Sequence, residues 1–240
     1  LGARASTAGV VLCPGVGFDV IPSDCLAATL KQALPDATHL ALGFDTRTGP
    51  SAGTAKTAIE ALAEGGRVRR DGKIVAVPLA WKSRRIDFGD GEKNAVTIPW
   101  GDVSTAYHST GIPNIEVYIP ASPRAAAGMK RMNALRWLLA LPPTQWAMKR
   151  GTRAIRGPSA EKRAKLPTFL WGEVRNAAGT VRVGRIRVPN TYDITITGSL
   201  TVVDHLLGAK PAPGAYTPSR LLGADLVTRL PDCGPIQITG

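Results

Sequence analysis

The segment VLCPGVGFDVIPSDCLAATLKQAL, from Val11 to Leu34, constrains the fold more than any other part of this sequence. An apolar run over Val10 to Cys13 meets Pro14-Gly15, as a buried strand ends at a turn. Leucines then recur at helical spacing, Ser23 stands where a helix N-cap is expected, and Pro35 ends the pattern. The sequence therefore predicts a strand, a glycine turn and a helix.

Two glycines of this turn match the beginning of a dinucleotide-binding motif. A GxGxxG motif between a strand and a helix lets the backbone approach a pyrophosphate at the helix N-terminus. Gly15-Val16-Gly17 supplies the first two glycines, and Val20 stands where the third belongs. The incomplete motif favours a tight turn, in which glycine provides a positive φ. A cofactor site is the alternative interpretation.

Size and composition indicate a globular protein. The chain has 240 residues, 44% of them apolar, and no apolar run approaches the roughly 20 residues that cross a bilayer. Its three cysteines form no CxxC pair, so we expect a reducing cytoplasm, with neither a disulfide framework nor a metal site. The chain begins LGARAS, without Met or a signal pattern, and we expect Leu1 to be a cut point in a longer polypeptide.

Positive charge is concentrated between Arg124 and Lys165. This segment contains eleven basic residues and one acidic residue, Glu161, whereas the whole chain has a formal charge of +12. Trp137 and Trp146 lie among the basic residues, as in an interfacial helix with aromatic anchors and a cationic rim. A solvated or domain-packing face, peripheral contact with an anionic membrane, and nucleic-acid binding are three interpretations. No nucleic-acid-binding motif supports the third, and we expect no such partner.

The spacing of apolar residues and the positions of turn residues predict the remaining strands and helices. The predicted strands are 39–44 and 114–121, two hairpins that turn at Asp71-Gly72 and Asp90-Gly91, and a longer hairpin over 169–188. The predicted helices are 54–64, 125–141, 145–150, 194–207 and a short one that begins at Pro218. The Thr and Val content of 194–207 leaves a strand as the alternative there. Gly, Pro and charge over 151–167 indicate a mobile loop.

Isolated reactive side chains identify no site by themselves. Asp19 and Asp24 bracket the turn, but their spacing gives them no fixed common face. Cys25 has apolar neighbours, which indicates an inert buried thiol. The histidines lack ligand spacing, so a structural role is the default for His39, His108 and His205.

Several longer stretches resemble the saccharopine dehydrogenase-like oxidoreductases: PGVGFDVIPSDCLAA, GTAKTAIEAL and IPWGDVSTAYHSTGIPNIEVYIPA. The C-terminal stretch PGAYTPSRLLGADLV is similar to the end of the bacterial branch of this family, which includes trans-acting enoyl reductases of lipid synthesis. The resemblance covers essentially the whole chain.

The resemblance and the element pattern together imply an α+β fold, a mixed and mostly antiparallel sheet covered by helices, with a remnant strand and helix of a Rossmann domain at the N-terminus. Residues 1–35 would end a nucleotide-binding domain and cross over from it. Residues 36–210 would form a substrate-binding and dimerisation domain with a basic helical insertion at 122–167. Residues 211–240 would return toward the nucleotide-binding domain. The GxGxxG loop is then expected upstream of Leu1, and the chain is expected to be inactive alone.

The function that the resemblance implies is hydride transfer by an NAD(P)-dependent oxidoreductase, in a homodimer, on a substrate that is a small molecule, a lipid or an acyl chain. The turn would border the NAD or NADP site through Pro14, Gly15, Gly17, Phe18 and Asp19. Motif position and hydroxyl chemistry suggest a substrate pocket that contains Ser23, Thr54, Tyr107, Ser109 and Thr110. No catalytic residue is identified. The alternative function is a non-catalytic module that docks on anionic lipid through residues 124–165, which would place it in the cytoplasm and peripherally at a membrane.

Overall fold

The computed structural model describes residues 2–49, 51–155, 157, 159, 161 and 165–240. Its strands are β1 (Val11–Leu12), β2 (His39–Thr46), β3 (Gly66–Arg70), β4 (Lys73–Val77), β5 (Ser83–Asp87), β6 (Glu92–Thr97), β7 (Asn114–Pro120), β8 (Thr168–Arg175), β9 (Val181–Val188), β10 (Gly214–Ala215) and β11 (Gln237–Thr239). Its helices are α1 (Gly2–Thr7), α2 (Ile21–Ala33), α3 (Ala52–Glu64), α4 (Asp102–Thr110), α5 (Pro123–Met132), α6 (Arg136–Leu139), α7 (Pro142–Gly151), α9 (Thr191–Ala209), α10 (Pro218–Leu222) and α11 (Leu226–Arg229), with 3-10 turns η1 (Asn133–Leu135) and η2 (Thr152–Ala154).

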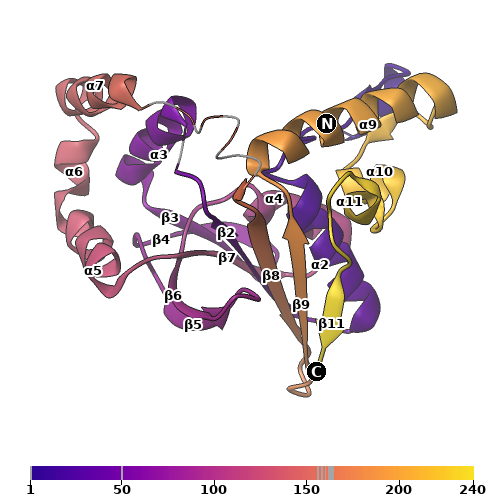
Figure 1. The fold of residues 1–240 in the computed structure, drawn as a ribbon, viewed down its shortest axis with the longest axis horizontal. Helices are drawn as coiled ribbons and strands as arrows, with labels where there is room; N and C mark the ends of the chain where they lie inside the picture. The colour runs from indigo at the N-terminus through magenta and orange to yellow at the C-terminus, as the bar shows by residue number, and fades with distance from the viewer. Residues whose placement is uncertain (1, 50, 156, 158, 160, 162–164) are drawn as a thin grey trace.

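A nine-stranded sheet forms the centre of the molecule (Figure 1). Its main order is β11-β9-β8-β2-β7-β3-β4, and the β5–β6 hairpin joins it through the pairing of β6 with β7. Only the β2–β7 pair is parallel among the pairings of this sheet within the described residues. The expected α+β class, with a mixed and mostly antiparallel sheet covered by helices, is confirmed.

Helix α2 packs closely on one face of the sheet, together with α4, α10 and α11. Leu26 and Leu30 of α2 are fully buried there. A Cβ atom added at Gly172 would lie 2.6 Å from Cδ1 of Leu30, and one added at Gly184 would lie 2.8 Å from Cδ1 of Leu26. The glycines of β8 and β9 therefore allow the helix to approach the sheet.

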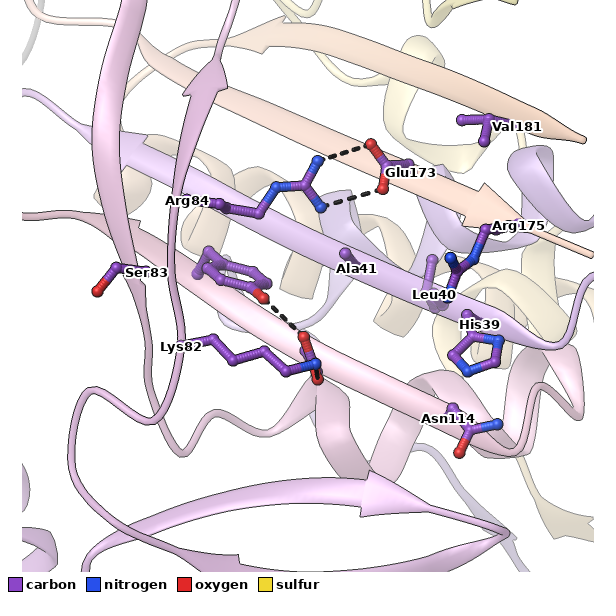
Figure 2. Close-up of a pocket in the computed structure, with 12 residues that line it drawn as sticks. His39, Leu40, Ala41, Lys82, Ser83, Arg84, Asn114, Glu173, Arg175 and Val181 are labelled. Carbon is purple, nitrogen blue, oxygen red and sulfur yellow. Dashed lines mark hydrogen bonds and ion pairs between the residues drawn. The ribbon is translucent and has the colours of Figure 1, made fainter. Parts of the chain in front are cut away.

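The β5–β6 hairpin covers part of the other face. Ile86 and Phe88 of this hairpin pack on Tyr118 and Trp171 of the sheet. Residues of β2, β5, β7 and β8 line a concave surface on this face, which Figure 2 shows.

Most predicted elements are confirmed, including the three hairpins and the helical assignment of α9. The sequence prediction was wrong or incomplete at several places. The strand expected to be buried over Val10 to Cys13 is the short β1, and Val10 and Leu12 are exposed. Helix α1 and strands β10 and β11 were not predicted.

Helix α2 begins at Ile21, so Ser23 lies inside the helix, and its hydroxyl donates to the carbonyl of Val20 instead of capping the helix. Helix α4 was not predicted. The helix expected over 125–141 is interrupted by η1, because the Asn133 side chain pairs with the backbone of Leu79.

Part of the loop predicted over 151–167 lies outside the described residues. Of this stretch, Gly151 ends α7 and Thr152–Ala154 forms η2. Among the residues that the structure describes, no helix has both the length and the apolar character needed to cross a bilayer.

Strands β1 and β10 form a separate two-stranded parallel sheet. Val11 pairs with Gly214 and Leu12 pairs with Ala215, so segments far apart in the sequence meet at the start of the glycine turn. Helix α9 connects β9 to β10 along the chain and lies at the opposite end of the long axis from α5, α6 and α7 (Figure 1).

Candidate functional site around the glycine turn

The turn between β1 and α2 needs glycine at two positions for different reasons. Gly15 has a φ of 75°, and a Cβ atom there would lie 2.6 Å from Cγ2 of Val20. Gly17 has no positive φ, but its Cβ atom would lie 3.2 Å from Cγ2 of Thr195 on α9. The first glycine makes the turn and the second lets it approach a helix, which agrees with the tight-turn interpretation.

Hydrogen bonds hold this turn against α9. The backbone N–H of Phe18 donates to Oγ1 of Thr195 at 3.1 Å, and the hydroxyl of Ser199 donates to the carbonyl of Val16, also at 3.1 Å. The turn is thus fixed from one side by side chains about 180 positions later in the chain.

Three aromatic rings form a wall on the other side of the turn. The rings of Phe18 and Phe44 meet edge to face with centroids 5.7 Å apart, and those of Phe44 and Trp100 lie 4.8 Å apart. The indole N–H of Trp100 also donates to the carbonyl of Asp19 at 3.2 Å. The half-buried Trp100 therefore presents a fixed aromatic surface beside the turn.

The N-terminal end of α2 is surrounded by carboxylates. Asp24 lies in its first turn and is fully buried, and Asp102 begins α4, which packs on α2. The exposed Asp19 lies just before α2, and desolvation raises the pKa of its carboxyl. These acids occupy the region where the helix dipole would otherwise favour a phosphate.

Asp24 joins α2 to α4 and α10. Its carboxylate accepts a hydrogen bond from the hydroxyl of Ser109 and another from the backbone N–H of Ser219 at 2.7 Å. The hydroxyls of Ser109 and Thr217 lie 2.7 Å apart. Burial raises the pKa of Asp24, and these hydrogen bonds partly offset the rise.

Asp102 is the exceptional member of this group. It is completely buried, and among the described residues neither of its carboxylate oxygens accepts a well-formed hydrogen bond. Desolvation raises the pKa of Asp102 to about 7, and the charge of Asp24 adds to the rise, while the hydroxyl of Ser23 lowers it. A buried carboxyl of this kind is able to hold a proton near neutral pH.

The structure brings together only part of the predicted substrate pocket. Ser23 and Ser109 lie in the acid cluster of α2 and α4. Thr54 lies at the exposed start of α3 beside Ser51, and Tyr107 stacks under the guanidinium of Arg69 at 4.2 Å. Thr110 is buried and donates to the carbonyl of Ala106 within α4. Thr54, Tyr107 and Thr110 thus have local structural contacts at separate places.

Sequence reasoning missed Trp100, Asp102 and Thr195. The signal for Asp102 was the placement of an acid after Gly101, at the start of a helix. Trp100 and Thr195 carry no local signal, because their contacts with the turn are made across the fold.

The cysteines and histidines offer no reactive centre in this region. Cys25 is fully buried, and desolvation raises the pKa of its thiol to about 12, which confirms the prediction of an inert thiol. In the described part of the chain, no group of three or more His, Cys, Asp or Glu side chains is arranged to hold a metal.

A second concave surface lies on the opposite face of the sheet and has a volume of about 500 Å³. Figure 2 shows that Arg84 binds both oxygens of Glu173, at 3.0 and 2.8 Å. Lys82 and the hydroxyl of Tyr118 both donate to Glu116, at 2.5 and 2.6 Å. Because both carboxylates of this surface are already bound by cations or a hydroxyl of the chain itself, we take the turn and not this surface as the candidate site.

Comparison with solved structures finds saccharopine dehydrogenase (L-Glu forming) from Saccharomyces cerevisiae, in its apo and histidine-tagged form. The TM-score is 0.59 at 10% sequence identity, and the likeness covers 100% of this chain and 76% of that one. The chain therefore has a saccharopine dehydrogenase-like fold. Comparison of the sequence with protein-family models gives no match, and neither does comparison with curated proteins.

Proposed function

We propose that this chain is the substrate-binding and dimerisation part of an NAD(P)-dependent oxidoreductase of the saccharopine dehydrogenase-like family, in its bacterial branch. It would transfer a hydride to or from a small-molecule, lipid or acyl substrate. One observation carries the proposal: the glycine turn is fixed between α9 and the aromatic wall of Phe18, Phe44 and Trp100, directly after β1. The fold of saccharopine dehydrogenase supports it.

The small β1–β10 sheet supports a nucleotide-binding neighbour. Parallel strands normally lie inside larger sheets that are covered on both faces, and two strands alone are marginally stable. Here each strand has two residues, and Val10 and Leu12 are exposed. Helix α9 beside it also exposes Ile196, Leu200, Val203 and Leu207, at spacings of one face of a helix. We infer that further parallel strands extend β1–β10 and cover this face of α9.

The residues of the turn fit one end of a dinucleotide only. Val20 fills the position of the third glycine, and Asp24 and Asp102 lie where a pyrophosphate would need positive potential. The aromatic surface of Trp100, by contrast, suits a nicotinamide ring. In this proposal the phosphates are bound by the neighbouring sheet, and the nicotinamide, which accepts or supplies the hydride, lies against the turn.

Energy transfer from tryptophan to bound NADH or NADPH tests this placement in the complete gene product. We expect Trp100→Phe to reduce the transfer and to weaken binding by about 1 kcal/mol, because ring stacking is lost. The control is Trp81→Phe, since Trp81 is exposed elsewhere on the surface. If both variants behave like the unmodified protein, the nicotinamide does not lie beside the turn.

Sedimentation of the same samples tests the dimerisation part of the proposal. A homodimer is expected. If the protein is a monomer at all concentrations, the dimerisation part of the proposal is wrong. That result would not affect the proposed position of the cofactor.

A further inference from the structure

The α5–α7 arm, residues 123–153, combines positive charge with exposed aromatic side chains. Between Arg124 and Arg153 the sequence has seven basic residues and no acidic one. The arm forms one end of the molecule (Figure 1). Its chemistry therefore differs from that of an ordinary solvated helical surface, where charges of both signs alternate.

Large apolar side chains of the arm face solvent. Trp137 is 69% exposed and Trp146 is 63% exposed, and Leu135, Leu138 and Leu141 are exposed beside them in sequence. Single exposed apolar residues are common, whereas five of them within the twelve residues from Leu135 to Trp146 indicate a binding surface.

Contacts with α3 determine which side of the arm is free. The guanidinium of Arg136 donates to the carbonyl of Ala63 at 3.1 and 3.2 Å, and the amide of Gln145 donates to the carbonyl of Ile59 at 3.2 Å. Lys149 pairs with Glu60 of α3 at 2.6 Å. These bonds hold one side of the arm on α3, so the tryptophans remain on the outer side.

The exposed cations of the arm are not neutralised. Five exposed basic residues of the arm have no ion-pair partner within the described part of the chain: Arg124, Lys130, Arg131, Arg150 and Arg153. The guanidinium of Arg150 lies 5.7 Å from the ring centroid of Trp146. Tryptophans beside unpaired cations match the boundary between lipid headgroups and acyl chains, where the ring buries its apolar body and the cation meets lipid phosphate.

We propose that the α5–α7 arm docks on the surface of an anionic lipid bilayer. Trp137, Leu141 and Trp146 enter the headgroup–acyl boundary, and Lys130 and Arg131 lie against anionic headgroups. A two-fold contact with a second copy of this chain would place the same basic surfaces against each other, which like-charge repulsion opposes. Nucleic acid would satisfy the cations and leave the leucines in water. This role is independent of the proposed oxidoreductase function.

Co-sedimentation of the whole protein with vesicles tests the proposal. We expect binding to vesicles of phosphatidylcholine with phosphatidylserine, weak binding to phosphatidylcholine alone, and release at high salt. Lys130→Glu with Arg131→Glu is expected to weaken binding at least about tenfold, since each basic residue near such a surface contributes about 1 kcal/mol. The matched control is Arg70→Glu with Lys73→Glu, which reverses the same charge at the exposed β3–β4 turn and leaves binding much less affected.

Trp137→Ser tests the aromatic anchor separately. We expect it to weaken vesicle binding several-fold at unchanged net charge. Its control is Trp81→Ser, the same substitution at an exposed tryptophan outside the arm. Circular dichroism verifies that each variant is folded.

Two kinds of result would overturn the proposal. Equal binding to charged and neutral vesicles, or equal loss in the Lys130/Arg131 variant and its control, would exclude a lipid contact made by this arm. So would a dimer in solution that Trp137→Ser dissociates, or tight binding of an RNA or DNA oligonucleotide that Trp137→Ser leaves unchanged.

Discussion

The ionisation of Asp102 makes the stability of the folded chain depend on pH. The carboxyl is fully buried, and desolvation raises its pKa to about 7 from an ordinary value of 3.8. The folded chain therefore keeps a proton that the unfolded chain releases between about pH 4 and pH 7. The stability that Asp102 contributes in its neutral form is complete below about pH 4 and is lost as the pH rises through 7.

Asp102→Asn should flatten this pH dependence. Each pH unit in that window lowers the free energy of unfolding of the unmodified chain by up to about 1.4 kcal/mol, and a neutral amide has no proton to lose. Urea unfolding at pH 5 and pH 8 measures the effect. Asp204→Asn, at an exposed position of α9, is the control and should leave the difference between the two pH values unchanged. A variant with the same slope as the unmodified chain would mean that Asp102 is ionised throughout.

Residue identities predicted some of these environments and not others. The apolar neighbours of Cys25 correctly indicated a buried thiol. Nothing in the sequence around Asp102 indicated that its carboxyl would be fully buried, because that burial comes from α2 packing on α4. The environment of a polar side chain depends on tertiary packing, which local sequence does not encode.

Helices α2, α4 and α10 depend on one another through the hydroxyl of Ser109. Ser109→Ala removes a donor from the buried carboxylate of Asp24 and the partner of Thr217. We expect the free energy of unfolding to fall by about 1–3 kcal/mol, since a buried acceptor loses a hydrogen bond. Ser104→Ala, on the same helix and without a side-chain hydrogen bond in the described structure, should change it little. Chemical denaturation of both variants measures the difference, and equal values would show that the cluster is not stabilising.

Element boundaries were predicted least well where side chains bond to the backbone. Ser23 has the chemistry of an N-cap, but Pro22 occupies the first turn of α2, and the helix begins before it. Helix α4 was missed because the hydroxyl-rich DVSTAYHST has little helical propensity by itself. The hairpins were predicted correctly, since Asp71 and Gly72 both take the positive φ that their turn requires.

At the scale of the molecule, four exposed apolar residues form a stripe along one face of α9: Ile196, Leu200, Val203 and Leu207. A stripe of this kind is typical of a surface that binds a partner. Leu200→Ser with Leu207→Ser should lower binding of a hydrophobic dye and reduce self-association, with a change in unfolding free energy within about 0.5 kcal/mol. Leu206→Ser is the contrasting variant, because Leu206 packs on the core and its loss should destabilise the chain by about 1–3 kcal/mol. If the stripe variant destabilises as much as Leu206→Ser, the stripe is already packed. Dye fluorescence and urea unfolding separate the two outcomes.

The alternation of apolar and polar residues, together with the turn residues, predicted that the chain forms a mostly antiparallel sheet. It did not predict the order of the strands in that sheet. Strand β2 pairs in parallel with β7 and in antiparallel with β8, although many residues separate it from both. The register of the strands is set by which of their residues face α2. Gly172 and Gly184 illustrate this, because both lie close against that helix.

The pairing of β1 with β10 also has a kinetic consequence. Val11 and Gly214 are about 200 residues apart, so their contact closes a very long loop. The entropy that this closure costs is offset by only two residue pairs. Such distant contacts form late, after the main sheet has brought the ends of α9 into place. The same strands should separate first. The amide protons of Gly214 and Tyr216, which bond to Val10 and Leu12, would then exchange with solvent while those of the large sheet are still protected.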